Sequence, residues 1–341
     1  MRVLVTGGSG YVGSSAVRAL AAAGHDVLIY DNLSTGHRKL SAGFELIEGD
    51  IADRDKLAPL LKRVDAVLHF AASAYVGESV HNPRKYFHNN VESSLALMDA
   101  VLASQVRIFV FSSTCAVYGV PESLPIVETS PRNPINPYGA TKLFFESVLA
   151  AYSVSHGLRY AALRYFNAVG AHPGGEVGEI HDPETHLIPL AVRASLGTAP
   201  PLTVFGSNLD TPDGTCVRDY IHVSDLASAH LKALHYLAGG GPSLALNLGT
   251  GKGTSIAELL GLIEQVSGRK VPFVFAPPRA GDPPVLLADA TRAKQVLGWT
   301  AQYDIRQIVA SAVQWEQNLP GFLKKVGTER ASPGTGPRPP A

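Results

Sequence analysis

The chain has 341 residues, of which 45% are hydrophobic and 17% charged, as expected of a folded protein with a sizeable core. Lysine plus arginine and aspartate plus glutamate each total 29, so the charge balance gives no reason to expect nucleic acid or an anionic membrane as a partner. The two cysteines, Cys115 and Cys216, have no metal-ligand spacing, and MRVLVTGG leads straight into a strand and a glycine turn. We therefore expect a reduced, cytoplasmic protein without a membrane span.

Short β-branched runs alternate with amphipathic helical stretches through the first half of the chain. The expected strands are VLVT, DVLIY, FELIEG, AVLHF, RIFVFSS and LRYAALRYF. Helices are expected up to about Ala23, near Leu57, near Leu95 and from about Tyr138. This alternation is typical of βαβ units and predicts an α/β fold with a doubly wound parallel sheet.

The character of the sequence changes beyond about Asn167, where turn-rich stretches such as AVGAHPGGEVGEIHDPE and APPRAGDPP interrupt the helices and strands. We expect a first domain over residues 1–168, to which a segment at about 217–248 returns. A smaller α/β substrate-binding domain is expected over residues 169–325. Residues 330–341 are rich in proline and glycine and are predicted to be disordered.

A glycine-rich turn follows the first expected strand and opens the first helix. In VLVTGGSGYVGSS, Gly7, Gly10 and Gly13 allow a tight turn and a close approach of the backbone to a pyrophosphate, to which the helix start offers N–H groups. Asp31 ends the second strand, where a carboxylate accepts hydrogen bonds from a ribose and repels a 2′-phosphate. The pattern predicts a Rossmann-type site for NAD, although the basic run at 37–39 leaves NADP open.

A tyrosine and a lysine, Tyr138 and Lys142 in NPYGATK, are four residues apart and so share one face of the expected helix. An ammonium group close to a phenol stabilises the phenolate and lowers its pKa, so that tyrosine can act as a base near neutral pH. Thr114 follows the strand RIFVFSS and brings a hydroxyl to the same edge of the sheet. We predict that these three side chains form a proton-handling unit beside a nicotinamide.

The motifs TGGSGYVG, SSTCAVYG and NPYGATK resemble those of the extended short-chain dehydrogenase/reductase family. DNLSTGH, RYFNAVGA, HLIPL, DGTCVRDYIHV and NLGTGKGTS follow in the order found in its 4-epimerases of UDP-hexoses, and the resemblance extends to about Leu319. It implies reversible interconversion of UDP-glucose and UDP-galactose by transient oxidation at C4 with tightly bound NAD. It also implies a homodimer joined through the helices near Leu95 and Leu143.

The resemblance assigns further residues to the cofactor and to the substrate. Those expected to contact NAD, besides the three glycines and Asp31, are Tyr11, Val12, Asn32, Asp50, Ile51, Phe70, Ala71, Ala72, Asn89, Tyr138, Lys142 and Tyr165. Those expected to contact the UDP-sugar are Thr114, Tyr138, Phe166, Asn167, His186, Leu187, Thr203, Val204, Phe205, Arg218, Arg279, Asp282 and Leu286. Arg218 and Arg279 can grip a diphosphate with forked donors. Taken by itself, Asp50 is better explained as a helix cap.

Two positions leave the identity of the sugar open. By the resemblance, Leu286 stands where a bulky tyrosine disfavours N-acetylhexosamines and a small residue admits them. UDP-N-acetylhexosamine, UDP-pentose and UDP-uronate therefore remain alternatives to the UDP-hexoses. His186 stands where other members have an asparagine near the nucleotide, which leaves the detail of that contact open.

Other kinds of function are disfavoured by particular residues. A sugar-nucleotide 4,6-dehydratase needs an acid pair after the threonine, and here Cys115 and Ala116 follow Thr114. A non-enzymatic NAD-binding sensor has no need for the threonine, the tyrosine and the lysine together. His172 and His181, like His186, lie in expected loops without the helical spacing of a catalytic metal site, so we expect no required metal.

Overall fold

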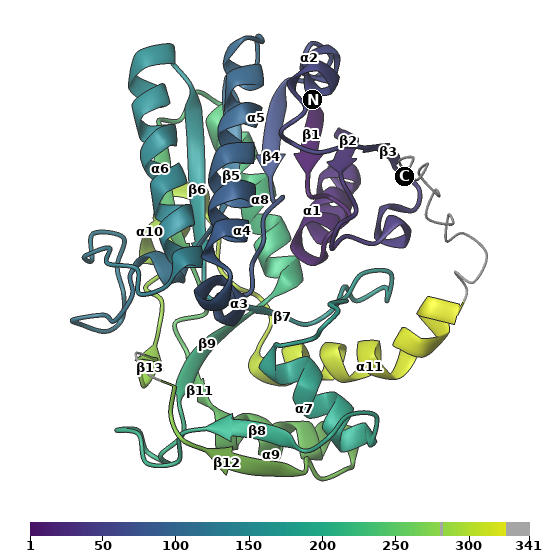
Figure 1. The fold of residues 1–341 in the computed structure, drawn as a ribbon, viewed down its shortest axis with the longest axis vertical. Helices are drawn as coiled ribbons and strands as arrows, with labels where there is room; N and C mark the ends of the chain where they lie inside the picture. Colours follow the sequence, from purple (N-terminus) through teal and green to yellow (C-terminus); the bar gives the residue numbers. More distant parts are fainter. Residues whose placement is uncertain (280–281, 325–341) are drawn as a thin grey trace, which may run out of the picture.

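A parallel sheet of seven strands is the largest element of this structure, a computed structural model that describes residues 1–279 and 282–324 (Figure 1). Its strands are β1 (Arg2–Thr6), β2 (Asp26–Asp31), β3 (Glu45–Glu48), β4 (Ala66–His69), β5 (Ile108–Thr114), β6 (Arg159–Tyr165) and β10 (Leu244–Leu248). They lie in the order β10-β6-β5-β4-β1-β2-β3, and all neighbouring pairs are parallel. The run from β3 to β6 is the Rossmann order, so the predicted α/β fold with a doubly wound sheet is confirmed.

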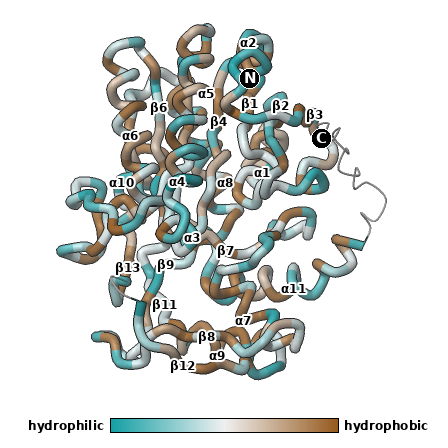
Figure 2. The backbone as a smooth tube through the Cα atoms, in the orientation of Figure 1, coloured by the Kyte–Doolittle hydropathy of each residue, from teal (hydrophilic) through white to brown (hydrophobic). Residues whose placement is uncertain are grey.

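Helices cover both faces of this sheet, because both faces of its strands are apolar. Val3 and Val5 of β1 enter one core cluster, whereas Leu4 between them enters the other. The first cluster is covered by α1 (Tyr11–Ala22), α8 (Val223–Ala238) and α10 (Thr291–Leu297), and the second by α2 (Arg54–Leu61), α5 (Ser93–Leu102) and α6 (Pro137–His156). Short helical turns connect them: η1 (Arg38–Ser41), α3 (Val76–His81), α4 (Pro83–Phe87), η2 (His88–Glu92) and η3 (Cys115–Val117). Figure 2 shows the hydrophobic residues gathered along these strands and helices.

The remaining elements build a second layered unit below the large sheet in Figure 1. It contains β7 (Asn167–Val169), β9 (Val217–His222), β11 (Gly253–Ser255) and β13 (Val285–Leu286) in one small sheet, and β8 (Leu202–Phe205) paired with β12 (Phe273–Ala276) in another. Its helices are α7 (Leu187–Leu196), α9 (Ile256–Ser267) and α11 (Ile305–Lys324), which share an apolar core with β8 and β9. A capping box starts α9, because Ser255 and Glu258 bond each other's backbone N–H groups.

The chain passes between the two units more than once. Within the segment 217–248, β9 belongs to a small sheet, whereas α8 and β10 join the large one. Residues 330–341, for which disorder is predicted, lie outside the described residues. None of the helices in residues 1–279 and 282–324 combines the length and the apolar character that crossing a membrane requires.

Candidate functional site

The glycine turn lies at the carboxyl ends of β1 and β4, where the strand order reverses and open α/β sheets bind ligands. Gly7 has a φ of 75°, and a Cβ atom there would lie 2.4 Å from the Ala71 nitrogen. A Cβ atom on Gly13 would lie 2.2 Å from the Gly7 carbonyl oxygen. Gly10 is the N-cap of α1, and Tyr11 and Val12 begin the helix. The backbone is therefore shaped to approach a pyrophosphate at the positive end of a helix dipole.

The carboxylate of Asp31 holds this turn in place from the end of β2. One oxygen accepts a 2.9 Å hydrogen bond from the Ser9 N–H group, and the other a 2.8 Å bond from Leu33 N–H. Burial raises the pKa of Asp31, and these two backbone hydrogen bonds oppose that rise. The side chain ends beside the glycine turn, where a ribose can reach it. Beyond it, Asn32 donates a 2.9 Å bond to the Asp50 carboxylate, which precedes the buried Ile51.

Further residues assigned to the cofactor follow β4 and β6 at the same edge of the sheet. Phe70 and Ala71 come directly after β4 and both donate backbone hydrogen bonds to the Thr6 carbonyl oxygen, followed by the half-buried Ala72. Asn89 donates a 3.3 Å hydrogen bond to the Ser73 hydroxyl group. The Tyr165 phenol, at the end of β6, hydrogen-bonds the Ser112 hydroxyl of β5. Phe70 and Tyr165 thus lie at the carboxyl ends of β4 and β6, at the same edge of the sheet as the glycine turn after β1.

The three candidate catalytic side chains lie where β5 meets the first turn of α6. Asn136 caps this helix by accepting a 2.8 Å bond from Gly139 N–H. A Cβ atom on Gly139 would lie 2.5 Å from the Ala116 carbonyl oxygen, so the helix start packs closely on the turn after Thr114. The Lys142 Nζ atom lies 5.8 Å from the centre of the Tyr138 ring, on the same helix face. Close packing of α6 on η3 therefore brings Thr114 and Tyr138 together.

The charges of this unit differ from the sequence-based expectation in one respect. Burial raises the pKa of Tyr138, although the hydrogen bond with the Thr114 hydroxyl opposes the rise. We had expected the neighbouring ammonium group to lower that pKa. The physical reason is that burial of Tyr138 itself disfavours the phenolate more than the Thr114 hydrogen bond favours it. Burial also lowers the pKa of Lys142, to about 7.

Two groups of residues assigned to the substrate lie in the second unit. Phe166 and Leu286 pack in one apolar cluster with Cys115, which follows Thr114. Leu286 of β13 also pairs in register with Arg218 of β9. Nearby, Asn167 donates a 3.0 Å bond to the Asp219 carbonyl oxygen.

The second group is centred on β8 and the segment after β12. The Arg279 guanidinium lies 4.1 Å from the centre of the Phe205 ring, and Asp282 N–H bonds the Arg279 carbonyl oxygen. Thr203 and Val204 alternate along β8, with Val204 buried and Thr203 exposed. Thr203 therefore lies on the same strand face as Phe205, whereas Val204 points to the other face, into the apolar core of the second unit.

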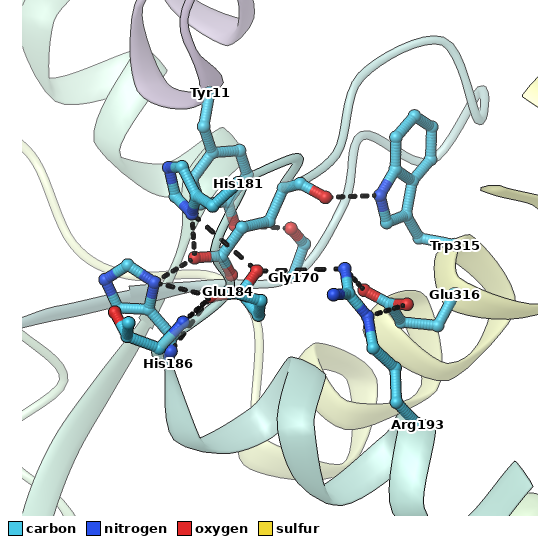
Figure 3. A network of polar contacts seen from close by, with 10 residues as sticks. Tyr11, Gly170, His181, Glu184, His186, Arg193, Trp315 and Glu316 are labelled. Atoms are coloured by element: carbon cyan, nitrogen blue, oxygen red, sulfur yellow. Dashed lines mark hydrogen bonds and ion pairs between the residues drawn. The ribbon is translucent and has the colours of Figure 1, made fainter. Parts of the chain in front are cut away.

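His186 and Leu187 begin α7, and His186 belongs to a cluster of two histidines and two glutamates (Figure 3). The His186 Nδ1 atom lies 2.8 Å from Glu179 Oε1 and 2.9 Å from Glu184 Oε1. Burial disfavours the charged imidazole, but the hydrogen bonds that it donates to both glutamates outweigh this effect and raise the pKa of His186 to about 10. The two glutamates were not predicted from the sequence, because the four side chains do not have the helical spacing of a catalytic metal site. The signal that could have found them is the pattern E-x-H-x-x-E-x-H at 179–186.

Comparison with known proteins shows relatives along nearly the whole chain. A model of the NAD dependent epimerase/dehydratase family matches residues 3–249. The UDP-glucose 4-epimerase of Azospirillum brasilense is 49% identical over 335 residues, which cover 97% of this chain and 96% of that protein. Among solved structures, the UDP-glucose 4-epimerase from Brucella ovis in complex with NAD superimposes with a TM-score of 0.90 at 50% identity, covering 92% of this chain and 98% of that one.

A second solved structure carries a different sugar nucleotide. The UDP-glucose-4-epimerase from Stenotrophomonas maltophila, with bound NAD and formylated UDP-arabinopyranose, has a TM-score of 0.92 and 41% identity, covering 94% of this chain and 99% of that one. The glycine turn, the carboxylate after β2 and the tyrosine and lysine of α6 agree with the family's use of NAD. The chain belongs to the NAD dependent epimerase/dehydratase family.

Proposed function

We propose that this chain interconverts UDP-glucose and UDP-galactose, using tightly bound NAD. The observation that carries the proposal is the position of Thr114, Tyr138 and Lys142, at the edge of the sheet where the glycine turn opens. A relative named UDP-glucose 4-epimerase, with half of its residues identical over nearly the whole chain, supports it.

Thr114, Tyr138 and Lys142 act together in the transfer of one proton. Tyr138 takes the proton of the sugar 4-hydroxyl, directly or through the Thr114 hydroxyl, and returns it to the opposite epimer. NAD⁺, when bound, supplies the acceptor for the hydride of the sugar C4. Lys142 stabilises the phenolate electrostatically, and it does so most when it is protonated. Because the hydride returns to the same carbon from the opposite face, the sugar leaves as its C4 epimer without net oxidation.

Binding of the substrate is divided between a firmly held nucleotide and a loosely held sugar. Arg218 and Arg279 hold the diphosphate through forked, permanently charged donors. Phe205, which already lies under the Arg279 guanidinium, packs along the uracil. The other residues that we propose for the UDP-sugar are Phe166, Asn167, His186, Leu187, Thr203, Val204, Asp282 and Leu286. A 4-keto sugar can then turn about its bonds to the diphosphate and present its other face.

The cofactor residues are proposed in the same way, and their geometry fits a dinucleotide. Gly7 and Gly13 of the glycine turn have no room for side chains, Gly10 has little, and Asp31 is held beside the turn. The remaining residues that we propose to line NAD are Tyr11, Val12, Asn32, Asp50, Ile51, Phe70, Ala71, Ala72, Asn89 and Tyr165. A buried carboxylate at Asp31 repels a 2′-phosphate, which favours NAD over NADP.

A UDP-pentose is the second candidate substrate. The observation that favours it is the formylated UDP-arabinopyranose bound by the Stenotrophomonas maltophila relative. Leu286 packs against the apolar cluster that contains Phe166, as does Cys115 next to Thr114, and leucine is intermediate between a closed and an open pocket. Because the size of Leu286 does not decide between these pockets, the experiment includes a UDP-N-acetylhexosamine as well as a UDP-pentose.

We further propose that the protein is a cytoplasmic homodimer, with residues 1–168 as the NAD-binding domain and residues 169–325 as the UDP-sugar-binding domain. Both cysteines are free, as a reducing compartment would keep them. Phe144 and Val154 of α6 are exposed, with 90% of the surface of Val154 accessible. These exposed apolar side chains support a dimer in which α5 and α6 pack against the helices of a second copy. Light scattering coupled to gel filtration measures the molecular mass in solution and so tests whether the protein is a dimer.

The reaction is tested with purified full-length protein, incubated separately with UDP-galactose, UDP-arabinopyranose and UDP-N-acetylgalactosamine without added reductant. Nuclear magnetic resonance follows each nucleotide sugar. Conversion of UDP-galactose to its gluco epimer supports the proposal. If the protein carries NAD and converts only the pentose nucleotide, the second candidate replaces the first. If it carries NAD and converts none of the three, the proposed reaction is wrong.

A further inference from the structure

Four potential metal ligands converge in the segment that joins β7 to α7. They are Glu179, His181, Glu184 and His186, and one ligand atom from each lies within 4.8 Å of all the others. The His181 Nδ1 atom lies 3.1 Å from Glu179 Oε1 and 3.7 Å from Glu184 Oε2. In Figure 3 both imidazole rings point their Nδ1 atoms toward the carboxylates between them. Two histidines and two carboxylates therefore share one centre.

Two of the atoms in this centre have no hydrogen-bond partner among the residues that the structure describes. They are the Oε2 atom of Glu184, whose side chain is only 2% exposed, and the Nδ1 atom of His181. His181 Nδ1 lies close enough to Glu179 for a hydrogen bond, but the angles do not allow one. Buried polar atoms are nearly always satisfied. A metal ion at the centre of the cluster would give both atoms a partner.

We propose that Glu179, His181, Glu184 and His186 bind one divalent transition-metal ion, with Zn²⁺ as the occupant. In a tetrahedral zinc site with bonds of about 2.0–2.2 Å, neighbouring ligand atoms lie roughly 3.4 Å apart. The four histidine-to-carboxylate separations in this cluster are 2.8, 2.9, 3.1 and 3.7 Å, so small shifts of the side chains would reach that spacing. Imidazole nitrogen with carboxylate oxygen is a ligand set that suits zinc, and two carboxylates neutralise a dication.

The surroundings of the cluster agree with a cation at its centre. Arg193 approaches Glu184 Oε2 at 3.8 Å, but its charge is matched by Glu316, whose carboxylate it grips at 2.7 and 3.1 Å. The glutamates of the cluster are thereby left to balance the metal. Trp315 donates a 2.9 Å bond to the Glu179 carbonyl oxygen and fixes the first ligand from α11. All four ligands come from eight consecutive residues, so little loop entropy is lost when they gather.

A metal ion here would join the two units of the structure. The His181 ring lies 6.5 Å from the Tyr11 ring at the start of α1 and 5.4 Å from the Tyr75 ring before α3. The same ion would hold His186, at the first turn of α7, in one orientation. The cluster shares His186 with the residues proposed for the UDP-sugar, but it shares no residue with the Thr114, Tyr138 and Lys142 unit and supplies no step of the proposed epimerisation. Its role is to order the segment between β7 and α7 against the glycine turn.

The test uses the full-length protein as purified, freed of metal with EDTA and then titrated with Zn²⁺ in a calorimeter. We expect one high-affinity zinc ion per chain and a higher melting temperature at saturation, because an ion that binds the folded state stabilises it. X-ray absorption of the zinc-loaded protein should show nitrogen and oxygen ligands with the scattering signature of two imidazoles. Absence of saturable binding, or a site with sulfur ligands, overturns the proposal.

Matched variants separate this cluster from the other histidines. His181→Asn and Glu184→Gln should each weaken zinc binding by about 100-fold or more, because each removes a direct ligand. The control is His172→Asn, since His172 pairs with Glu176 at 2.9 Å on the same segment but lies outside the cluster. It should bind zinc like the wild type. Equal affinity in all four proteins overturns the proposal, and the X-ray absorption measurement decides it if neither ligand variant folds.

Discussion

The ammonium group of Lys142 donates a 2.9 Å hydrogen bond to the carbonyl oxygen of Ser112. The acceptor lies on β5, two residues before Thr114, so the lysine is anchored to the strand that carries the threonine. The same nitrogen lies 4.8 Å from the centre of the Phe111 ring. Its position beside Tyr138 is therefore set by the strand as well as by the helix.

Replacing the phenol of Tyr138 should abolish turnover while leaving the fold intact. We expect Tyr138→Phe to lower the rate of UDP-galactose conversion by roughly 10² to 10⁴-fold, since that is the usual contribution of a positioned acid or base. The matched control is Tyr160→Phe, a half-buried tyrosine on β6. It should keep the rate within a few-fold. A Tyr138→Phe variant with normal turnover and bound NAD would show that another group moves the proton.

The buried ion pair between Glu146 and Arg164 should be costly to break. Both side chains are at most 4% exposed, and they are joined by hydrogen bonds of 2.9, 3.2 and 2.6 Å. Arg164→Met leaves a buried carboxylate without its partner and should lower the free energy of unfolding by about 3–5 kcal/mol. The double variant Glu146→Leu with Arg164→Met should recover part of the loss.

The control for this pair is on the surface. Arg38 and Glu48 form an ion pair in which both side chains are more than half exposed. Arg38→Ala should cost less than about 1 kcal/mol. Guanidinium chloride unfolding gives all three values, and equal costs for Arg164→Met and Arg38→Ala would contradict the prediction.

Replacement by alanine should have opposite effects at two glycines that lie in helices. Gly13→Ala places a Cβ atom 2.2 Å from the Gly7 carbonyl oxygen, so it should distort the turn and lose bound NAD. Gly261 lies exposed within α9, and a Cβ atom there meets nothing within 4 Å. Gly261→Ala should raise the free energy of unfolding by roughly 0.5–1 kcal/mol. Cofactor absorbance and thermal melts check both, and retention of NAD by Gly13→Ala would refute the first half.

Buried His69 should make the protein sensitive to acid. Its side chain bonds the Thr6 hydroxyl at 2.7 Å, and burial, together with the charge of Lys142, lowers its pKa to about 3. Between the ordinary histidine value of about 6.5 and this value, the unfolded chain binds a proton that the folded chain does not. Neutral His69 therefore makes its full contribution to the free energy of unfolding above about pH 6.5. This contribution falls by about 1.4 kcal/mol for each pH unit below that value.

The variant His69→Gln isolates this effect, because glutamine has no titrating group. The free energy of unfolding is measured by urea titration from about pH 5.5 to about pH 4. As the pH falls, it should decrease less steeply in the variant than in the wild type, and the two slopes should differ by about 1.4 kcal/mol per pH unit. An unchanged slope would mean that His69 is already protonated in the fold.

Leu286 should set the size of the accepted sugar. It packs against the apolar cluster that contains Phe166, as does Cys115 next to Thr114. Leu286→Gly opens this space and should raise kcat/KM for UDP-N-acetylgalactosamine relative to UDP-galactose by roughly 10-fold, since one or a few methylenes in a pocket change discrimination by 10 to 200-fold. Leu286→Tyr should lower the same ratio. If neither variant changes it, the pocket for the sugar 2-substituent lies elsewhere.

The large sheet could be predicted from the sequence because its strands are apolar runs with clear turn signals. VLVT became β1 and DVLIY became most of β2, with both faces buried. The second unit was harder, because β7, β11 and β13 have only two or three residues and carry no periodic pattern. Their pairing depends on contacts between distant segments, such as Arg218 beside Leu286.

The candidate site, like the fold, could be predicted where it depends on local sequence and not where it depends on contacts between distant segments. Local motifs identified the glycine turn and the tyrosine and lysine of α6, because each depends on neighbours within one segment. The Lys142 contact with Ser112 and the lowered pKa of Lys142 depend on burial, which spacing alone does not reveal. The Glu179 to His186 cluster was missed because its ligands are arranged by an irregular loop rather than by a helix.

The position of β10 at the edge of the large sheet has a consequence for how the chain is made. Its partner β6 ends at Tyr165, but β10 begins only at Leu244, after β7, α7, β8 and β9. At a synthesis rate of about 5–20 residues per second, roughly 4–16 s separate the two strands as they leave the ribosome. During that interval the nascent chain presents an open strand edge and the uncovered apolar face that α8 will close, and both features favour aggregation.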